Sequence, residues 1–186
     1  MGSYLNPGNK GFQESLNSEI YVDKTGLIEK TNEVLDTRQK FLCVSRPRRF
    51  GKSMAADMLA AYYERGEDSA ELFGTLKISK VESYEKNRNQ YDIIKVNMQE
   101  FLSMTHSMDE MLSMLQKYLI FDLTDHFDNV RFRDENNLIQ VMKDIYSKTK
   151  HSFVILIDEW DCLFREYQQD QEAQKKYLDF LRAWLK

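Results

Sequence analysis

Cysteine and proline are both scarce in this chain, which has two of each among its 186 residues. Two cysteines cannot form the network of several disulfides that stabilises small secreted domains. We therefore interpret Cys43 and Cys162 as buried free thiols of a protein in the reducing cytoplasm. Proline, which interrupts helices and strands, occurs only as Pro7 and Pro47. Long elements are expected over most of the chain.

Long apolar runs are missing too. The longest, Phe153 to Ile157, has the length of a strand, whereas a membrane-spanning helix needs about 20 apolar residues. The first eight residues have neither the basic nor the apolar region of a signal peptide. The net charge of −4 predicts no bulk attraction to nucleic acid, although a local basic patch would provide one. We expect a soluble, cytoplasmic protein without membrane association.

Short apolar segments alternate with stretches of helical periodicity. Strands are predicted at residues 40–44, 92–98 and 153–157, and helices after residue 25, from about 53 to 66, at 108–119, at 135–147 and at 173–185. Fully apolar strands separated by helices are typical of an α/β fold whose parallel sheet is covered on both faces. Residues 1–186 are interpreted as part of one such domain.

A phosphate-binding loop is predicted between the first strand and the helix after it, the context that such a loop requires. Backbone N–H groups there point at phosphates, and Gly51 lets the backbone come close. Lys52 supplies a positive charge to the β and γ phosphates, and the Ser53 hydroxyl suits Mg²⁺. The residues expected to bind the nucleotide are Arg48, Arg49, Phe50, Gly51, Lys52, Ser53 and Met54.

The loop departs from the usual pattern at one place, because Arg46 stands at the first glycine position. It precedes Pro47, which favours an extended backbone. By chance alone, a Gly-Lys-Ser or Gly-Lys-Thr triplet occurs in about one chain of this length in ten. The prediction therefore depends on the strand before it, the helix after it and a partner motif downstream.

That partner is an acidic pair at the end of the third predicted strand, Asp158 and Glu159. In P-loop NTPases an aspartate at this place helps to hold Mg²⁺, a role that we assign to Asp158. Glu159 is placed to act as base toward the attacking water. Acidic residues also end strands at solvent or cap the next helix, but the phosphate loop upstream favours the functional interpretation. Asp161 suits a metal shell, a partner subunit or a helix cap equally well.

Three segments together resemble the bacterial AAA-ATPase-like family: residues 21–25 (Tyr-Val-Asp-Lys-Thr), 45–53 around the phosphate loop, and 157–161 around the acidic pair. The resemblance runs along essentially the whole chain. Members of that family usually have arginine at the position of Arg46. At the position of Trp160 they usually have tyrosine. The resemblance implies a P-loop NTPase fold of the AAA type, a three-layer sandwich with a parallel sheet.

The resemblance also implies that the chain is the N-terminal part of a longer protein. In this ATPase class a further strand, with a polar sensor residue, lies between the phosphate-loop strand and the acidic strand but follows the acidic strand in sequence. That strand and an arginine finger are not found in residues 1–186, and the sheet is expected to be incomplete. Such a chain would expose its sheet edges or pair the phosphate-loop strand directly with the acidic strand. Family members typically continue into a region similar to restriction-endonuclease-like nucleases, which these residues do not contain.

Several functions remain open from the sequence. The first is Mg²⁺-dependent ATP hydrolysis, with Lys52 and Glu159 as catalytic residues and Ser53 and Asp158 as metal ligands, in a regulatory or motor module. The second is a nucleotide-binding switch that hydrolyses little. The third is a nucleic-acid contact, through the basic residues Arg46, Arg48 and Arg49 or through a downstream region. A small-molecule kinase fits the acidic pair less well.

ATP and Mg²⁺ are the expected ligands, and self-association into a homo-oligomer is a further alternative. The histidines, at positions 106, 126 and 151, are scattered, and none has a partner at the spacing of a zinc site. The sequence does not indicate what the ATPase would act on.

Overall fold

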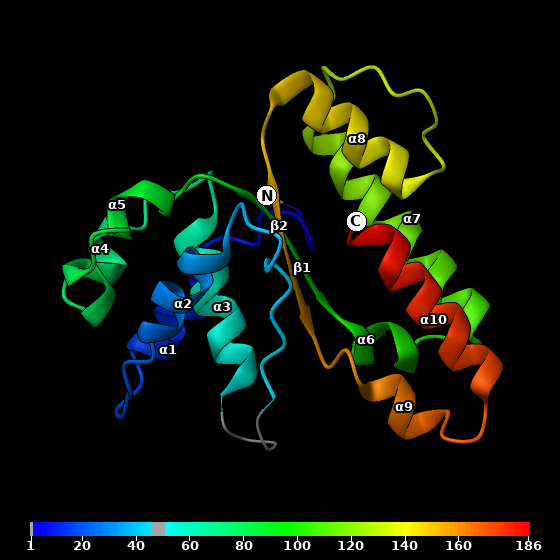
Figure 1. Ribbon diagram of the computed structural model, residues 1–186, viewed down its shortest axis with the longest axis horizontal. Helices are drawn as coiled ribbons and strands as arrows, with labels where there is room; N and C mark the ends of the chain where they lie inside the picture. Colours follow the sequence, from blue (N-terminus) through cyan, green and yellow to red (C-terminus); the bar gives the residue numbers. More distant parts are fainter. Residues whose placement is uncertain (1, 46–50) are drawn as a thin grey trace. The chain divides into compact units, whose positions relative to one another are not determined.

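The computed structural model describes residues 2–45 and 51–186 of this mixed α/β protein (Figure 1). The chain divides into two compact units. The N-terminal unit is Asn6–Ile93, and the C-terminal unit comprises the residues up to Leu5 together with Ile94–Lys186. Each unit is described by itself.

The N-terminal unit is built from short helices around an aromatic core. Its elements are α1 (Lys10–Leu16), α2 (Gly26–Val34), α3 (Lys52–Tyr63), α4 (Ala70–Phe73), the 3₁₀ helix η1 (Lys77–Lys80) and α5 (Tyr84–Asn87). α1 packs against α3, and the rings of Phe12 and Phe73 stack with centroids 4.8 Å apart. Tyr62 and Tyr63, near the end of α3, are completely or almost completely buried. The core therefore fixes the C-terminal half of α3 and leaves its first turn toward solvent.

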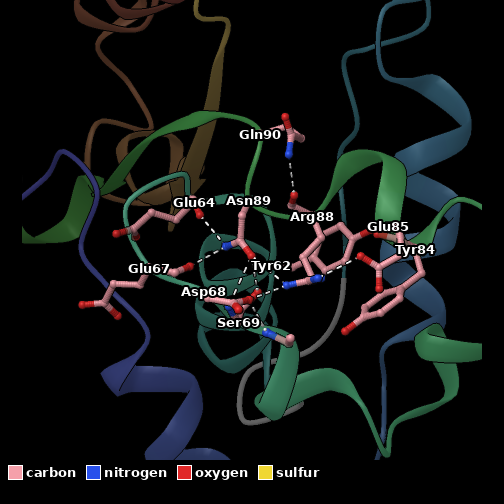
Figure 2. Close-up of polar contacts among 11 residues, drawn as sticks. Tyr62, Glu64, Glu67, Asp68, Ser69, Tyr84, Glu85, Arg88, Asn89 and Gln90 are labelled. Atoms are coloured by element: carbon pink, nitrogen blue, oxygen red, sulfur yellow. Dashed lines mark hydrogen bonds and ion pairs between the residues drawn. The ribbon is translucent and has the colours of Figure 1, made fainter.

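Asn89 joins the end of α3 to the segment that leads into the first strand (Figure 2). Its Nδ2 donates to the carbonyl oxygens of Glu64 and Glu67, each at 2.6 Å, and its Oδ1 accepts from the N–H and hydroxyl of Ser69. A φ of 57° places Asn89 in the left-handed region, which asparagine tolerates better than most residues. Arg88 extends the cluster by pairing with Asp68. This network holds the residues that follow α3 against the residues that lead into the first strand.

The C-terminal unit contains most of a two-stranded parallel sheet, formed by β1 (Asp92–Asn97) and β2 (Phe153–Asp158). Its helices are α6 (Met98–Ser103), α7 (Met108–His126), α8 (Leu138–Thr149), α9 (Cys162–Glu166) and α10 (Gln171–Trp184). α7, α8 and α10 pack against one another (Figure 1). Their buried apolar residues, among them Met111, Leu115, Val141 and Tyr177, form one core cluster with Val96 of β1. Phe153, Ile155 and Ile157 of β2 pack against this cluster.

Polar caps explain where these helices begin. The side chains of Ser107, Asn137 and Asp170 each accept a hydrogen bond from a backbone N–H in the first turn of α7, α8 and α10. Such caps satisfy donors that the helix itself leaves unpaired. The predicted strands at 92–98 and 153–157 and the predicted helices of this unit are confirmed, with α8 beginning three residues later than expected.

The strand predicted at residues 40–44 is wrong. Residues 40–45 have no regular secondary structure, and Phe41, Leu42 and Val44 are 60%, 51% and 43% exposed. A buried strand needs a neighbour for its backbone N–H and C=O groups, and no described strand pairs with this segment. Cys43 is therefore exposed rather than buried, whereas Cys162 is buried as predicted.

The predicted three-layer sandwich is not seen in the described residues. The sheet has two strands instead of three, and every residue of β2 is partly exposed although its composition is almost wholly apolar. The predicted strand order placed a further strand between the phosphate-loop strand and the acidic strand. Because the phosphate-loop strand does not form, the structure does not test that order, which stays a prediction. A mixed α/β architecture with a small parallel sheet is what the structure shows.

No helix in the described residues is both long enough and apolar enough to cross a membrane.

Candidate functional site

The start of α3 carries the described part of the predicted phosphate loop. Gly51 is the N-cap residue, with φ 75° and ψ 36°, and its carbonyl accepts the first helical hydrogen bond from Ala55 N at 3.0 Å. Lys52 begins the helix and is partly buried, whereas Ser53 and Met54 are exposed. The remaining loop residues of this prediction, Arg46, Arg48, Arg49 and Phe50, lie outside the described residues.

The backbone conformation at position 51 favours glycine. The left-handed backbone costs any residue with a Cβ roughly 1–2 kcal/mol. A Cβ at this position would also lie 3.0 Å from Lys24 Nζ and 3.7 Å from Met54 Sδ. The first turn of α3 contains no acidic side chain, so its positive dipole end is compatible with an anion.

Asp23 and Thr25 hold the segment before α2 against the start of η1. One carboxylate oxygen of Asp23 accepts from Thr25 N and Thr25 Oγ1, at 2.9 and 2.6 Å, and the other accepts from Lys77 N at 2.8 Å. Thr25, fully buried, accepts in turn from Ile78 N. Burial alone would raise the pKa of Asp23, but the hydrogen bonds from Thr25 and Lys77 outweigh it and lower the pKa below its usual value.

Thr25 occupies the N-cap position of α2, but its side chain makes no capping hydrogen bond. The Tyr-Val-Asp-Lys-Thr motif at residues 21–25 thus has a structural role in its Asp and Thr, which connect two segments about 50 positions apart in the sequence. Lys24, between them, is exposed.

The acidic pair lies at the end of β2, in the C-terminal unit. Asp158 is the last residue of the strand, and its Oδ1 accepts from Glu159 N at 2.9 Å. Glu159 Oε2 pairs with Arg165 of α9 at 2.6 Å, and the same guanidinium pairs with Asp161 at 2.8 Å. The hydrogen bond to Glu159 contributes most to raising the pKa of Arg165. Asp161, at the N-cap position of α9, makes no capping hydrogen bond with its side chain and pairs with Arg165 instead.

Glu159 has a φ of 50°, in the left-handed region that side chains with a Cβ avoid. Such a conformation costs a residue of this type about 1 kcal/mol or more and is concentrated at functional sites. The turn that follows is held by Cys162 N donating to Glu159 O at 3.0 Å and by Tyr177 Oη donating to Trp160 O at 2.9 Å. The fold therefore imposes this backbone on Glu159.

The expected site residues fall into the two units. Gly51, Lys52 and Ser53 come together at the start of α3 in the N-terminal unit, and Asp158 and Glu159 come together at the end of β2 in the C-terminal unit. Among the described residues, no group of three or more His, Cys, Asp or Glu side chains is placed to hold a metal. Mg²⁺ is commonly held by one or two protein oxygens with phosphates and waters, so the hydroxyl of Ser53 and the carboxylate of Asp158 fit its chemistry.

Sequence reasoning misses two side chains. Arg165 pairs with Glu159 because the turn at Glu159 directs α9 back toward that residue. The signal that the sequence does offer is the spacing of four residues between Asp161 and Arg165, which allows an ion pair on one helix face. Lys24 lies within a motif to which the sequence alone assigns no role. A hollow of about 430 Å³ in the C-terminal unit is lined by α7 with Glu135 and Asn136, and none of the expected site residues lines it.

Comparison with known proteins places the chain in a family. A family model described as predicted AAA-ATPase matches residues 8–186. The chain belongs to the AAA-ATPase-like family. No curated protein and no solved structure matches this AAA-ATPase-like chain. Membership supports nucleotide binding in general terms; the nuclease-like region expected from the resemblance stays a prediction.

Proposed function

We propose that this AAA-ATPase-like chain binds ATP with Mg²⁺ and, within the protein to which it belongs, hydrolyses it. The observation that carries the proposal is the start of α3, where a left-handed glycine is followed by Lys52 and Ser53 at the positive end of a 12-residue helix. Backbone N–H groups at such a helix start can bind phosphate oxygens, and Lys52 adds a positive charge to the phosphates. Family membership supports the same ligand class.

Ser53 and Asp158 are the proposed magnesium ligands. Bound Mg²⁺ would neutralise charge on the phosphate oxygens, which is its usual contribution to phosphoryl transfer. The hydrogen bond that Asp158 Oδ1 accepts from Glu159 N orients the carboxylate at the end of β2. A ligand whose orientation is set in this way loses less freedom when it binds the metal.

Glu159 is the proposed general base for the attacking water. In the structure its carboxylate is paired with the guanidinium group of Arg165. Hydrolysis would therefore require Glu159 to turn from Arg165 toward the water. The ion pair favours a second candidate function, a nucleotide-dependent switch that binds ATP and hydrolyses it slowly until the pair is opened. The nucleic-acid contact through Arg46, Arg48 and Arg49 involves residues outside those described and remains an alternative.

Two substitutions test the proposal in the full chain. Lys52→Ala should lower ATP affinity by about 100-fold, because hydrogen bonds to charged groups are worth roughly 1.5–3 kcal/mol each and the charge on the phosphates is left less compensated. Glu159→Gln should keep ATP affinity and reduce turnover by about 100-fold or more. Calorimetry gives the affinity, and phosphate release gives the turnover.

Lys30→Ala is the matched control, since Lys30 is an exposed α2 lysine paired only with Glu33 in the described contacts. A folded Lys52→Ala variant that binds ATP as tightly as the wild type would overturn the phosphate-site assignment. If the wild type binds ATP but turns over no faster than Glu159→Gln, the switch function is the correct one.

A further inference from the structure

Lys24 reaches the start of α3 from a different part of the N-terminal unit. Its Nζ lies 3.0 Å from the position that a Cβ on Gly51 would occupy. The ammonium group is thus beside the backbone at which a phosphate would bind. Sequence spacing gives no hint of this contact, because the two residues are 27 positions apart.

We propose that Lys24 is a second phosphate-binding lysine of this site, an inference that rests on the proposed function. A cation is disfavoured at the N-terminal end of a helix by the helix dipole. An anion bound to that end reverses the balance, because it attracts both the helix end and the cation. Lys24 and Lys52 would then bind the polyphosphate from two segments of the chain.

The backbone on both sides of Lys24 is held in place independently of its side chain. Four hydrogen bonds join Asp23 and Thr25 to each other and to the first residues of η1. Thr25 is fully buried, whereas the side chain of Lys24 is exposed. Asp23 and Thr25 thus fix the backbone position from which the Lys24 side chain extends to Gly51.

Preorganisation of this kind lowers the cost of binding. A lysine on a free loop loses side-chain and backbone freedom when it contacts a ligand. Here the backbone on either side of Lys24 is already ordered by the hydrogen bonds of Asp23 and Thr25. The expected contribution of Lys24 is that of one charge-assisted contact, smaller than that of Lys52, whose own backbone belongs to the loop.

The test compares three variants of the full chain by calorimetry with ATP and Mg²⁺. Lys24→Met keeps the aliphatic stem and removes the charge; it should lower ATP affinity about 10- to 100-fold in a chain that still unfolds cooperatively. Lys24→Arg, which keeps the charge, should recover most of the affinity. Lys30→Met, with the same change on an exposed face of α2, should bind ATP like the wild type.

The outcomes separate this inference from the proposed function. If Lys52→Ala loses ATP affinity but Lys24→Met stays within twofold of the wild type, Lys24 is not a phosphate ligand and the proposed function stands. If Lys24→Met unfolds at a lower temperature without nucleotide and Lys24→Arg restores no affinity, the role of Lys24 is structural and the inference is wrong. A wild-type chain that binds no ATP overturns the proposed function and this inference together.

Discussion

At the scale of single residues, a positive φ marks one position in each half of the proposed site. Gly51 has φ 75° where the loop enters α3, and Glu159 has φ 50° where β2 turns into α9. Glycine adopts this conformation without strain, so the backbone at position 51 costs no conformational energy. Glutamate does not, and the strained backbone at position 159 is more easily understood if its carboxylate is needed there.

Gly51→Ala should lower the free energy of unfolding by about 1–2 kcal/mol through backbone strain, because a shift of the flexible Lys24 side chain can relieve the 3.0 Å approach of its Nζ to the new Cβ. Urea unfolding measures the change. Gly26→Ala is the control: Gly26 is the first residue of α2, and a Cβ there would have no atom within 4 Å. That substitution should be neutral or stabilising by about 0.4–1 kcal/mol. Equal effects at the two positions would contradict the role given to Gly51.

At the scale of elements, the sequence predicted best the helices and strands that pack within one unit. The helix predicted at 108–119, which continues to residue 126, and the strands predicted at 92–98 and 153–157 are confirmed, because their apolar residues face a core that the same unit provides. Residues 40–44 have an equally apolar composition, but strand formation depends on a pairing partner, and composition does not encode one. The ion pair of Glu159 with Arg165 could not be predicted, because it depends on the unusual backbone at Glu159.

The segment between residues 21 and 25 leads to a prediction about pH. Since the pKa of Asp23 is lowered in the folded protein, its contribution to stability is complete above the ordinary aspartate pKa of 3.8 and is lost as the pH falls through the lower native value. Asp23→Asn should therefore be less stable than the wild type at pH 7, and the difference should shrink below about pH 4. Thermal unfolding from pH 7 to about pH 3 measures it.

Asp134→Asn is a suitable control, because Asp134 is exposed and accepts only a local backbone hydrogen bond in the described contacts. A difference between Asp23→Asn and the wild type that stays constant down to about pH 3 would show that the Asp23 carboxylate does not stabilise the fold through its charge.

At the scale of the whole molecule, the residues proposed to bind ATP and Mg²⁺ are divided between the two units. The phosphate-binding residues belong to the N-terminal unit, and the acidic pair belongs to the C-terminal unit. The sequence predicted both motifs, since each is a local string of residues in its expected place after a strand or before a helix. Ser53 and Asp158, the proposed magnesium ligands, belong to different units.

The Mg²⁺ dependence of ATP affinity tests the proposed binding of ATP with Mg²⁺ most directly. In the wild-type chain, calorimetry should show tighter ATP binding with Mg²⁺ than with EDTA. Asp158→Asn should remove most of that difference while leaving the affinity measured in EDTA unchanged, since Lys52 and the start of α3 remain intact. Asp161→Asn, a neighbouring carboxylate that pairs with Arg165, should retain the wild-type dependence. An Asp158→Asn variant whose ATP affinity responds to Mg²⁺ as the wild type does would contradict the proposed role of Asp158 as a magnesium ligand.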